Sequence, residues 1–377
     1  MRTNLEELKA IVASYVNEQY QANPTYTPSN DNLAGLVNKI AATFQIDGLF
    51  QDKLPEMDGF DITYGRTIEE YFQNLGAVLD KPSTEANAAQ DALKPYYPSY
   101  EDPSYNYSLG KKIIPTTVQY NDYERGVKSE AEYNGLINTI LKRLYDLYAV
   151  FKYGCKRQIL GNAIDKAIKA DKTYTTGATA YTTNSTVISR GTRYSQSGVA
   201  YLCIKTASGA INKTLATLAA EGEYVVALDL VTTIAKPVDS TTGEAFLVEV
   251  KKWIEKASDV SQATSFNGAA IGVPESDLML VMLQGIKPSL DVDTEAGAFN
   301  PEKLGINAVT RIVPDFGNDS STAYAILFDA RALKLHPNYM AVRTQDNGAW
   351  DFINYFLHSE HTAFIGRNQF IHVFKAS

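Results

Sequence analysis

The sequence predicts an α+β fold, in which helices and strands occur without the regular alternation of a parallel βαβ protein. One observation is a run of apolar residues at helical spacing over 130–169, which is far longer than an average helix. The other is a series of short, β-branched apolar stretches downstream, separated by turns that contain Pro, Gly, Asp and Asn. No repeat of fixed period is visible in the sequence. We therefore expect one long helix in a domain of mixed elements.

Composition indicates an ordinary globular chain large enough for one or two cores. Its 377 residues are 45% hydrophobic and 21% charged. No run approaches the roughly 18 apolar residues that a membrane span needs. The stretch from Met1 to Tyr20 carries Glu6, Glu7 and Glu18 and lacks the pattern of a secretory signal. We expect a protein without a membrane segment that works where it is made.

The charge balance and the cysteines exclude two further classes. A net charge of −8 opposes attraction to DNA phosphates, so any contact with DNA should be weak and nonspecific. Cys155 and Cys203 form neither a close pair nor a CxxC motif. This predicts two buried thiols and neither a disulfide framework nor a zinc knuckle.

The N-terminal third is predicted to be an arm followed by a long loop. In 1–61, apolar residues recur at helical spacing before Pro24 and Pro28 break the pattern, and they are too few for a separate core. The segment 62–120 is rich in Tyr, Pro, Ser and Asn. Long loops of this kind often make contacts, and tyrosines supply large contact area. We expect it to contact a neighbouring subunit; the alternative is that it packs on its own chain.

The central helix is predicted from Glu130 to Lys169. Ser129 and Glu132 have the spacing of a capping box at its start. At 1.5 Å per residue, the helix would be about 60 Å long, with a bend considered at Gly154 or Gly161. A coiled coil is the alternative, but the sequence lacks clean a/d heptads.

The remaining elements are strands and one amphipathic helix. Residues 171–209 are rich in Thr, Ser, Tyr and Gly and predict strands and turns, and a stronger strand is predicted at Tyr224–Ala235. From Glu244 to Ala257, apolar residues lie on one face of a helix. Further predicted strands are Val199–Thr206, Leu278–Leu283, Ala308–Val313, Tyr324–Phe328 and Phe370–Phe374.

No motif in the sequence supports a catalytic or metal site. The phosphate-binding loop, the nucleophile elbow and the HExxH helix are all missing. His358 and His361 would share one face of a helix, but no third ligand follows, so polar residues in a connecting segment are the favoured interpretation. We predict no catalytic residue, no cofactor and no metal.

Acidic residues and sequons also receive a structural interpretation. Four carboxylates occupy positions 1, 3, 5 and 12 of a calcium-type loop, but Ala296 stands where the sixth-position glycine is required; they are Asp291, Asp293, Glu295 and Glu302. Glu69 and Glu70, like Glu6 and Glu7, are predicted to be surface charges. The sequons at Asn184, Asn212 and Asn318 have no meaning without a secretory route.

Three stretches resemble the major capsid proteins of small short-tailed bacteriophages. Gly65–Tyr71 is similar to the opening of their extended loop, and Phe246–Asn300 to their axial domain. Leu327-Phe328-Asp329, then Asp351–Tyr355 and the strand Phe370–Phe374, resemble their closing segment. The order and spacing agree across most of residues 60–377, although none of these stretches is a strict signature.

This resemblance implies the Hong Kong 97-type capsid fold and a division of the chain. The implied parts are an N-terminal arm, an extended loop, a peripheral domain with a spine helix, an axial domain and a return to the peripheral domain; their ranges are 1–61, 62–120, 121–240, 241–332 and 333–377. Two departures accompany it. Residues 170–222 look like an extra, inserted segment, and no immunoglobulin-like decoration follows Ser377.

The resemblance also implies a shell-building function. The expected product is an icosahedral head, assembled in the host bacterial cytoplasm from pentamers and hexamers of this chain around double-stranded DNA. A separate scaffolding protein and a portal protein are the expected partners. Two alternatives stay open: a tail or portal protein, which would form rings instead of closed shells, and a carbohydrate-active enzyme, which would need converging carboxylates in a concave site.

Overall fold

The computed structural model describes residues 52–62, 68–70, 72–73, 100–101, 104–105, 108–119, 130–286, 308–317, 322–350 and 352–376. The chain divides into two units. Unit 1 consists of residues 1–51, 111–151 and 340–359, and unit 2 of 52–110, 152–339 and 360–377. Most of the predicted arm and of the predicted loop lies outside the described residues. Within those residues, no helix is long and apolar enough to span a membrane.

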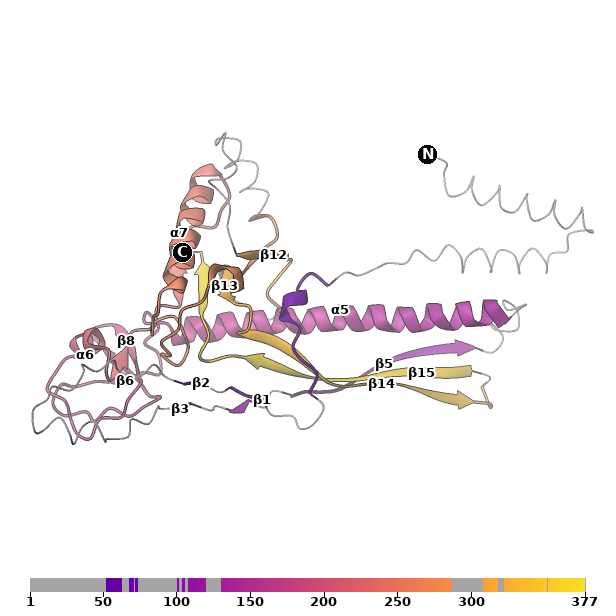
Figure 1. The fold of residues 1–377 in the computed structure, drawn as a ribbon, viewed down its shortest axis with the longest axis horizontal. Coiled ribbons are helices and arrows are strands. Elements are labelled where there is room, and N and C mark those ends of the chain that lie inside the picture. The colour runs from indigo at the N-terminus through magenta and orange to yellow at the C-terminus, as the bar shows by residue number, and fades with distance from the viewer. Residues whose placement is uncertain are drawn as a thin grey trace, which may run out of the picture. The chain divides into compact units, whose positions relative to one another are not determined.

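The long central helix is confirmed. Helix α5 (Glu130–Ala170) contains 41 residues, which corresponds to about 61 Å (Figure 1). It runs without a break through Gly154 and Gly161, whereas Ser129 of the expected capping box lies outside the described residues. Its second half carries a stripe of side chains that this chain itself buries, so a coiled-coil partner is not needed to cover them: Cys155, Ile159, Leu160, Ala163, Ile164 and Ala167.

A five-stranded sheet forms the centre of unit 2. Its strand order is β10 (Val231–Thr233), β16 (Ile371–Lys375), β13 (Ala323–Asp329), β11 (Leu278–Leu283) and β12 (Val309–Val313). β13 is antiparallel to both neighbours, and the two outer pairs are parallel. All seven residues of β13 are buried, as expected for a central strand covered on both faces. The predicted strands at 278–283, 308–313, 324–328 and 370–374 are thereby confirmed within one residue at either end.

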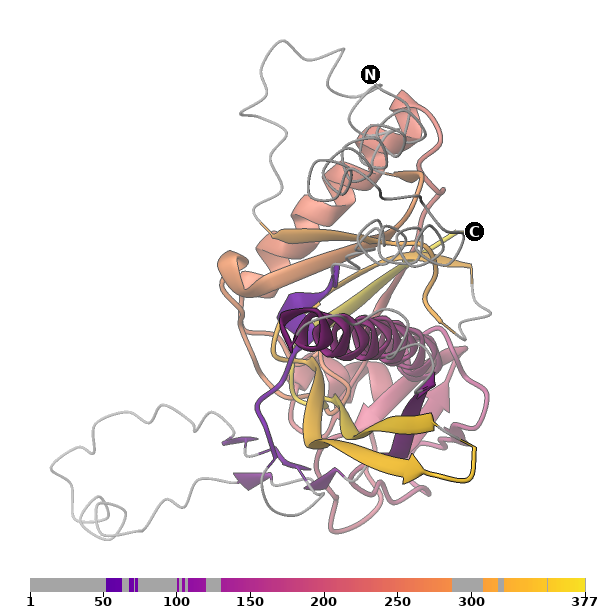
Figure 2. The ribbon, with the colours of Figure 1, turned by 90° about the vertical axis from the view of Figure 1, so that its right-hand side faces the viewer.

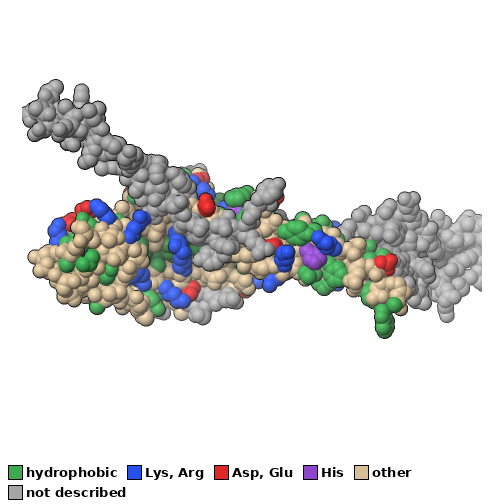
Figure 3. All heavy atoms as spheres, turned by 90° about the horizontal axis from the view of Figure 1, so that it is seen from below, with side chains coloured by type: hydrophobic (Ala, Val, Ile, Leu, Met, Phe, Trp, Pro, Cys, Tyr) green, Lys and Arg blue, Asp and Glu red, His purple; other side chains and the backbone are tan. Residues whose placement is uncertain are grey.

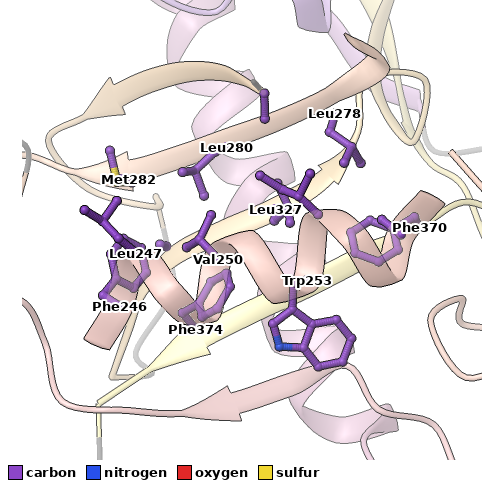
Figure 4. Close-up of a cluster of buried hydrophobic side chains, with 14 of the residues drawn as sticks. Phe246, Leu247, Val250, Trp253, Leu278, Leu280, Met282, Leu327, Phe370 and Phe374 are labelled. Carbon is purple, nitrogen blue, oxygen red and sulfur yellow. The ribbon is translucent and has the colours of Figure 1, made fainter. Parts of the chain in front are cut away.

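Helix α7 (Ser240–Ser258) lies on one face of this sheet (Figure 2). It begins earlier than predicted because Asp239 and Thr242 form a capping box. Its apolar face packs against the even-numbered side chains of β11 and against the aromatic rings of the C-terminal strand region (Figure 4). Labelled members of this core are Phe246, Val250, Trp253, Leu278, Leu280, Met282, Leu327, Phe370 and Phe374.

The predicted continuous strand Tyr224–Ala235 is wrong. The chain forms two short strands there, β9 (Val225–Val226) and β10, which belong to different sheets. The physical reason is the polar residue between them: the Asp229 carboxylate pairs with Lys172 and Lys256, and this contact holds the chain out of either ladder. Strand propensity describes the residues but cannot detect such a tertiary contact.

Residues 172–228 contain a sheet and a core of their own. The sheet order is β6 (Thr179–Ala180), β7 (Arg193–Gln196), β8 (Val199–Cys203) and β9, accompanied by the short helix α6 (Leu215–Glu221). The predicted strand Val199–Thr206 is confirmed over its first five residues. The predicted inserted segment, 170–222, therefore forms strands around a small core.

Two long strands form a hairpin that pairs with a strand from the loop region. The order is β14 (Leu333–Asn347), β15 (Phe352–Ile365) and β5 (Ser108–Gln119) (Figure 1). Two short ladders connect parts of the loop: β1 (Ile68–Glu69) with β4 (Ser104–Tyr105), and β2 (Phe72–Gln73) with β3 (Tyr100–Glu101). Short 3-10 turns occur at Pro55–Met57 and Glu275–Asp277.

The expected division at residues 240 and 332 stays a prediction. The five-stranded sheet takes β10 from before the first boundary, β11 to β13 from between the two, and β16 from after the second. The chain thus leaves this sheet and returns to it, so one core contains residues from separate parts of the sequence.

Candidate assembly surface

Residues 52–62 form a segment, here named the strap, that packs on unit 2. Asp58 bridges to Leu335 of β14, and the amide of Gly59 donates to the Leu335 carbonyl over 2.9 Å. Leu54 and Met57 are fully buried. The strap is therefore fixed by backbone bonds and apolar burial together.

A fully buried lysine holds the strap to α5. The ammonium of Lys156 donates to the Leu54 carbonyl over 2.6 Å and pairs with Asp58 over 2.9 Å and with Asp52. Lys152 also pairs with Asp58, over 2.8 Å. Burial alone would raise the pKa of Asp58, but the hydrogen bonds from both lysines outweigh it, and this pKa lies below its ordinary value. Asp58 is thus an ionised partner of a buried charge.

A second ion pair holds the strap to β12. The Arg311 guanidinium donates to both carboxylate oxygens of Glu56, and this hydrogen bonding lowers the pKa of Glu56. On the other side, the Lys334 ammonium donates to the Glu56 carbonyl over 2.7 Å. The strap thereby contacts α5, β12 and β14.

The loop begins at an anchored root. Ile62 and Ile68 pack with Phe364 of β15 in a small buried cluster. The Glu70 carboxylate accepts hydrogen bonds from the amides of Arg367 and Asn368, each over 3.1 Å. Glu70 is 8% exposed, so its prediction as a surface charge is wrong, whereas Glu69 is exposed as predicted. A buried carboxylate with two amide donors is a structural anchor.

The hairpin part of unit 1 leaves strand surface uncovered. From Met340 to Asp346, β14 has exposed or half-exposed residues at every position, without the alternation of a strand with one buried face. Met340 is 50% exposed and Val342 37%. On β5, Ile113 is 55% exposed. Apolar strand surface of this kind marks a site of protein contact.

Along the neighbouring strand β15, buried and half-buried residues alternate, and the half-buried residues identify its outer face. Tyr355 and Leu357 are buried, whereas Asn354, Phe356 and His358 are half-buried on the opposite face. There the Thr117 hydroxyl of β5 donates to the Asn354 side chain over 2.7 Å. In Figure 3, hydrophobic side chains surround a histidine on the face shown. We name this the hairpin face: Ile113, Thr117, Met340, Val342, Asn354, Phe356 and His358.

The turn between β14 and β15 presents a large aromatic side chain. Trp350 is 76% exposed, the highest value among the large hydrophobic residues that the structure describes. The turn is held by backbone and side-chain bonds to Asn347, including the Ala349 amide over 3.2 Å. Tryptophan is enriched at the centres of protein interfaces. A tryptophan on a fixed turn is suited to insert into a partner surface.

The interpretation of His358 and His361 as part of a connecting segment is wrong. Both lie on strand β15, where residues three apart point to opposite faces, so they do not face one ligand. His361 is 1% exposed, and burial, with a smaller effect of Lys152, lowers its pKa to about 4. The two imidazoles thus belong to different environments, one buried and one on the hairpin face.

The other predicted sites have mixed outcomes. The run from Asp291 to Glu302 lies outside the described residues, as do Asn318, Glu6 and Glu7. Over the residues that are described, no group of three or more His, Cys, Asp or Glu could hold a metal ion. Asn184 and Asn212 are exposed. Cys155 and Cys203 are buried and not joined in a disulfide, as predicted, and burial raises the pKa of Cys203.

Sequence reasoning missed Lys156 as a structural residue. The signal was present, because Lys156 stands one helical turn before Ile159 and Leu160 on the apolar stripe of α5. A lysine on such a stripe needs a carboxylate partner when it is buried. The partners, Asp52 and Asp58, lie about 100 positions earlier in the sequence, and no local pattern links them to the helix.

Comparisons with known proteins agree with this architecture. The chain is similar to one in the capsid structure of Staphylococcus phage Andhra, with 12% identity over 87% of this chain and 85% of that chain and a TM-score of 0.55. A chain in the structure of the head fiber and inner core protein of native bacteriophage P68 gives 11% identity, 88% and 86% coverage, and a TM-score of 0.55. At these identities, the likeness shows the fold. Among curated protein sequences, none matches significantly.

The Hong Kong 97-type capsid fold that the resemblance implied is therefore confirmed. A family model supplies the function: the model described as Phi29-like phage major capsid protein matches residues 3–374. This match covers nearly the whole chain, including parts of both units and residues 170–222. The tail, portal and carbohydrate-enzyme alternatives receive no support. The chain belongs to the Phi29-like phage major capsid protein family, and it is a subunit of the capsid shell of a virion.

Proposed function

We propose that this chain closes an icosahedral head by repeated contacts with its own copies in rings of five and six. The observation that carries the proposal is the hairpin face, where β14 is uncovered at every position from Met340 to Asp346. Repeated contacts between different patches of identical subunits generate closed rings. Many such contacts make a shell stable even when each one is modest.

The loop is proposed to lie on an adjacent subunit. Its root is held by Glu70 and by the cluster of Ile62, Ile68 and Phe364, so the loop leaves its own subunit at a fixed place. Tyrosine and proline between 74 and 99 give contact area and stiffness, and they lack the alternating apolar run of a private core. The domain division implied by the resemblance is proposed with it.

Further partners follow from what a shell must do. A separate scaffolding protein, a portal protein and double-stranded DNA are proposed, with assembly in the host bacterial cytoplasm. The net charge of −8 supports a weak and nonspecific contact with DNA, because packaged DNA must move past the wall. The subunit is proposed to have no enzymatic activity.

A loop deletion tests the proposal. Residues 76–98 are replaced by a short Gly-Ser turn, so that the ladders β1–β4 and β2–β3 remain. Shortening a surface loop changes the closure free energy by about 1 kcal/mol, so the subunit should stay folded. Negative-stain microscopy and sedimentation, with scaffolding protein present, should then show particles for the parent chain and none, or fragile ones, for the deletion variant. A variant that unfolds as a monomer would place the loop in the core of its own subunit.

A further inference from the structure

Residues 172–228, named the module from here on, bury a core that is separate from the main core of unit 2. The module's core consists of Tyr181, Ile188, Tyr194, Tyr201, Cys203, Ala207, Leu215, Leu218 and Val225, and it shares no residue with the core under α7. Its sheet is separate too, since β6 to β9 pair only with each other. A segment with its own sheet and core can fold and unfold as an independent cooperative unit.

Internal polar contacts complete the module. The hydroxyl of Tyr181, which directly follows β6, donates to the carbonyls of Ile211 and Lys213 just before α6. The Gln196 side chain accepts from the Leu215 amide over 2.7 Å, at the first turn of that helix. The loops of the module are thus tied to its own strands, and its fold does not need α7 or β11 for these bonds.

The two chain ends of the module meet at one carboxylate, in a joint that we name the neck (171–173 and 228–231). Asp171 is 1% exposed. One of its oxygens accepts from the amides of Leu230 and Val231, over 2.9 and 3.1 Å. The other accepts from the amide and the hydroxyl of Thr173, over 2.9 and 2.7 Å. The Lys172 amide also donates to the Leu228 carbonyl over 2.9 Å, so the ends lie side by side.

Side chains on both sides of the neck set its orientation. From the module, the Arg193 guanidinium donates to the carbonyls of Lys169, Asp171 and Tyr174, where α5 ends. On the other side, Lys256 of α7 pairs with Asp229 over 2.8 Å, and Lys172 pairs with the same carboxylate over 2.9 Å. At Gly268 the chain also approaches apolar side chains of the module closely: an added Cβ would lie 2.6 Å from Ile204 and 3.0 Å from Val226. The module is therefore attached in one orientation by a small polar joint.

We propose that the module is an accessory domain carried by the shell-building subunit, and that Asp171 is the positioning residue that closes its neck. The subunit folds and builds shells without the module, which makes this position a natural site for adding or exchanging polypeptide. The claim that shells form without the module rests on the proposed shell assembly. The claim that the subunit folds without the module does not. Contact between the neck ends is the reason that removal leaves only a short gap.

Hydrogen exchange on the full chain tests independent folding. Leu218→Ala opens a cavity in the module core, and Leu280→Ala is the matched change in the core under α7, both at sites at most 1% exposed. Leu218→Ala should lower protection of β7 and β8 amides about 100-fold and leave β11 and β13 unchanged. Leu280→Ala should lower protection of β11 and β13. Equal loss in both sheets from Leu218→Ala would show one cooperative unit and overturn the proposal.

A deletion tests the accessory role. Residues 173–227 are replaced by a short Gly-Ser linker between Lys172 and Leu228. Helix content should fall little, and shells should form as they do for the parent chain. A variant that fails to fold, or that folds without building shells while the parent does, overturns the proposal. If the parent itself builds no shells, the proposed assembly is wrong. The hydrogen-exchange experiment then decides by itself whether the module folds independently.

The positioning role of Asp171 has its own readout. Asp171→Ala should raise the rate of proteolysis within 171–173 and 228–231 about 10-fold, with both cores still protected in hydrogen exchange. Asp165→Ala, at an exposed acid near the end of α5, is the control and should change neither the rate of proteolysis nor the hydrogen-exchange protection. If Asp171→Ala lowered the hydrogen-exchange protection of β11 and β13, Asp171 would support the core of the five-stranded sheet, and its positioning role would be overturned.

Discussion

Lys156 carries a fully buried charge, and its loss should destabilise the subunit. Removing one partner of a buried ion pair typically costs about 3 kcal/mol, and Lys156→Met also removes the hydrogen bond from the ammonium to the Leu54 carbonyl. We expect a loss of about 3 kcal/mol, reduced to the extent that Asp52 and Asp58 reach solvent. Urea denaturation measures it. Lys169→Met, which breaks an exposed pair with Asp165, should change stability by less than about 0.5 kcal/mol.

Gly59 lies where a side chain does not fit. A Cβ there would lie 2.3 Å from the His336 ring, which is 3% exposed and whose Nδ1 lies 3.0 Å from the Phe60 carbonyl. Gly59→Ala should therefore cost about 2 kcal/mol through overpacking. Gly348→Ala, at a turn with open space around the added carbon, is the matched control. Thermal unfolding of both variants would contradict the argument if their melting temperatures were equal.

The buried histidines make stability depend on pH. Burial lowers the pKa of His361 to about 4 and that of His372 to about 3, so both are neutral in the folded subunit. The unfolded chain binds these protons at higher pH, with a pKa near 6.5. Their contribution is therefore complete above about pH 6.5 and is lost as the pH falls toward the folded pKa values.

The size of this effect can be measured by urea unfolding between pH 7 and pH 5. Each histidine should account for a loss of about 2 kcal/mol over that range. His361→Gln should make the dependence on pH weaker. Asn354→Gln, at a half-buried position of the same strand that carries no titrating group, should leave it nearly unchanged. A similar change in slope from both variants would contradict the assignment to burial.

At the scale of elements, the β14–β15 hairpin should serve assembly more than folding. Trp350→Ser removes a side chain that is 76% exposed, so the melting temperature of the free subunit should change by less than about 2 °C. Buried tryptophans in interfaces often contribute 2 kcal/mol or more, so the yield of shells should fall sharply. Sedimentation with scaffolding protein measures the yield. Val260→Ser, a 61% exposed site outside the hairpin, is the control.

At the scale of the whole molecule, we expect assembly and stability to be independent of metal ions. Incubation with EDTA should leave the melting temperature and the yield of shells unchanged. A decrease of more than about 4 °C, which corresponds to roughly 1 kcal/mol or more, would contradict this expectation. In that case, the carboxylates from Asp291 to Glu302 are the first residues to substitute.

Local patterns predicted the elements well where one period dominates. The helical period of α5 and the apolar runs of β11 and β13 identify these elements because a continuous stretch satisfies one geometry. The strand at 224–235 failed because the Asp229 carboxylate pairs with Lys256 of α7, and the amides of Leu230 and Val231 donate to Asp171, which follows α5. The connecting segment predicted at His358 and His361 was wrong as well, because the polar run from His358 to His361 interrupts the apolar pattern of β15, although Ser359, Glu360 and His361 are buried in the strand.

The sequence by itself determined the α+β class, the long helix, most strands and, through resemblance, the capsid family. Only the tertiary structure decided that Lys156 is buried between Asp52 and Asp58, that Glu70 anchors the loop, and that Asp171 joins the two ends of the module. The physical reason is the range of the interactions. Hydrophobic period acts between neighbours in sequence, whereas an ion pair or a buried carboxylate depends on groups that meet only after the chain has folded.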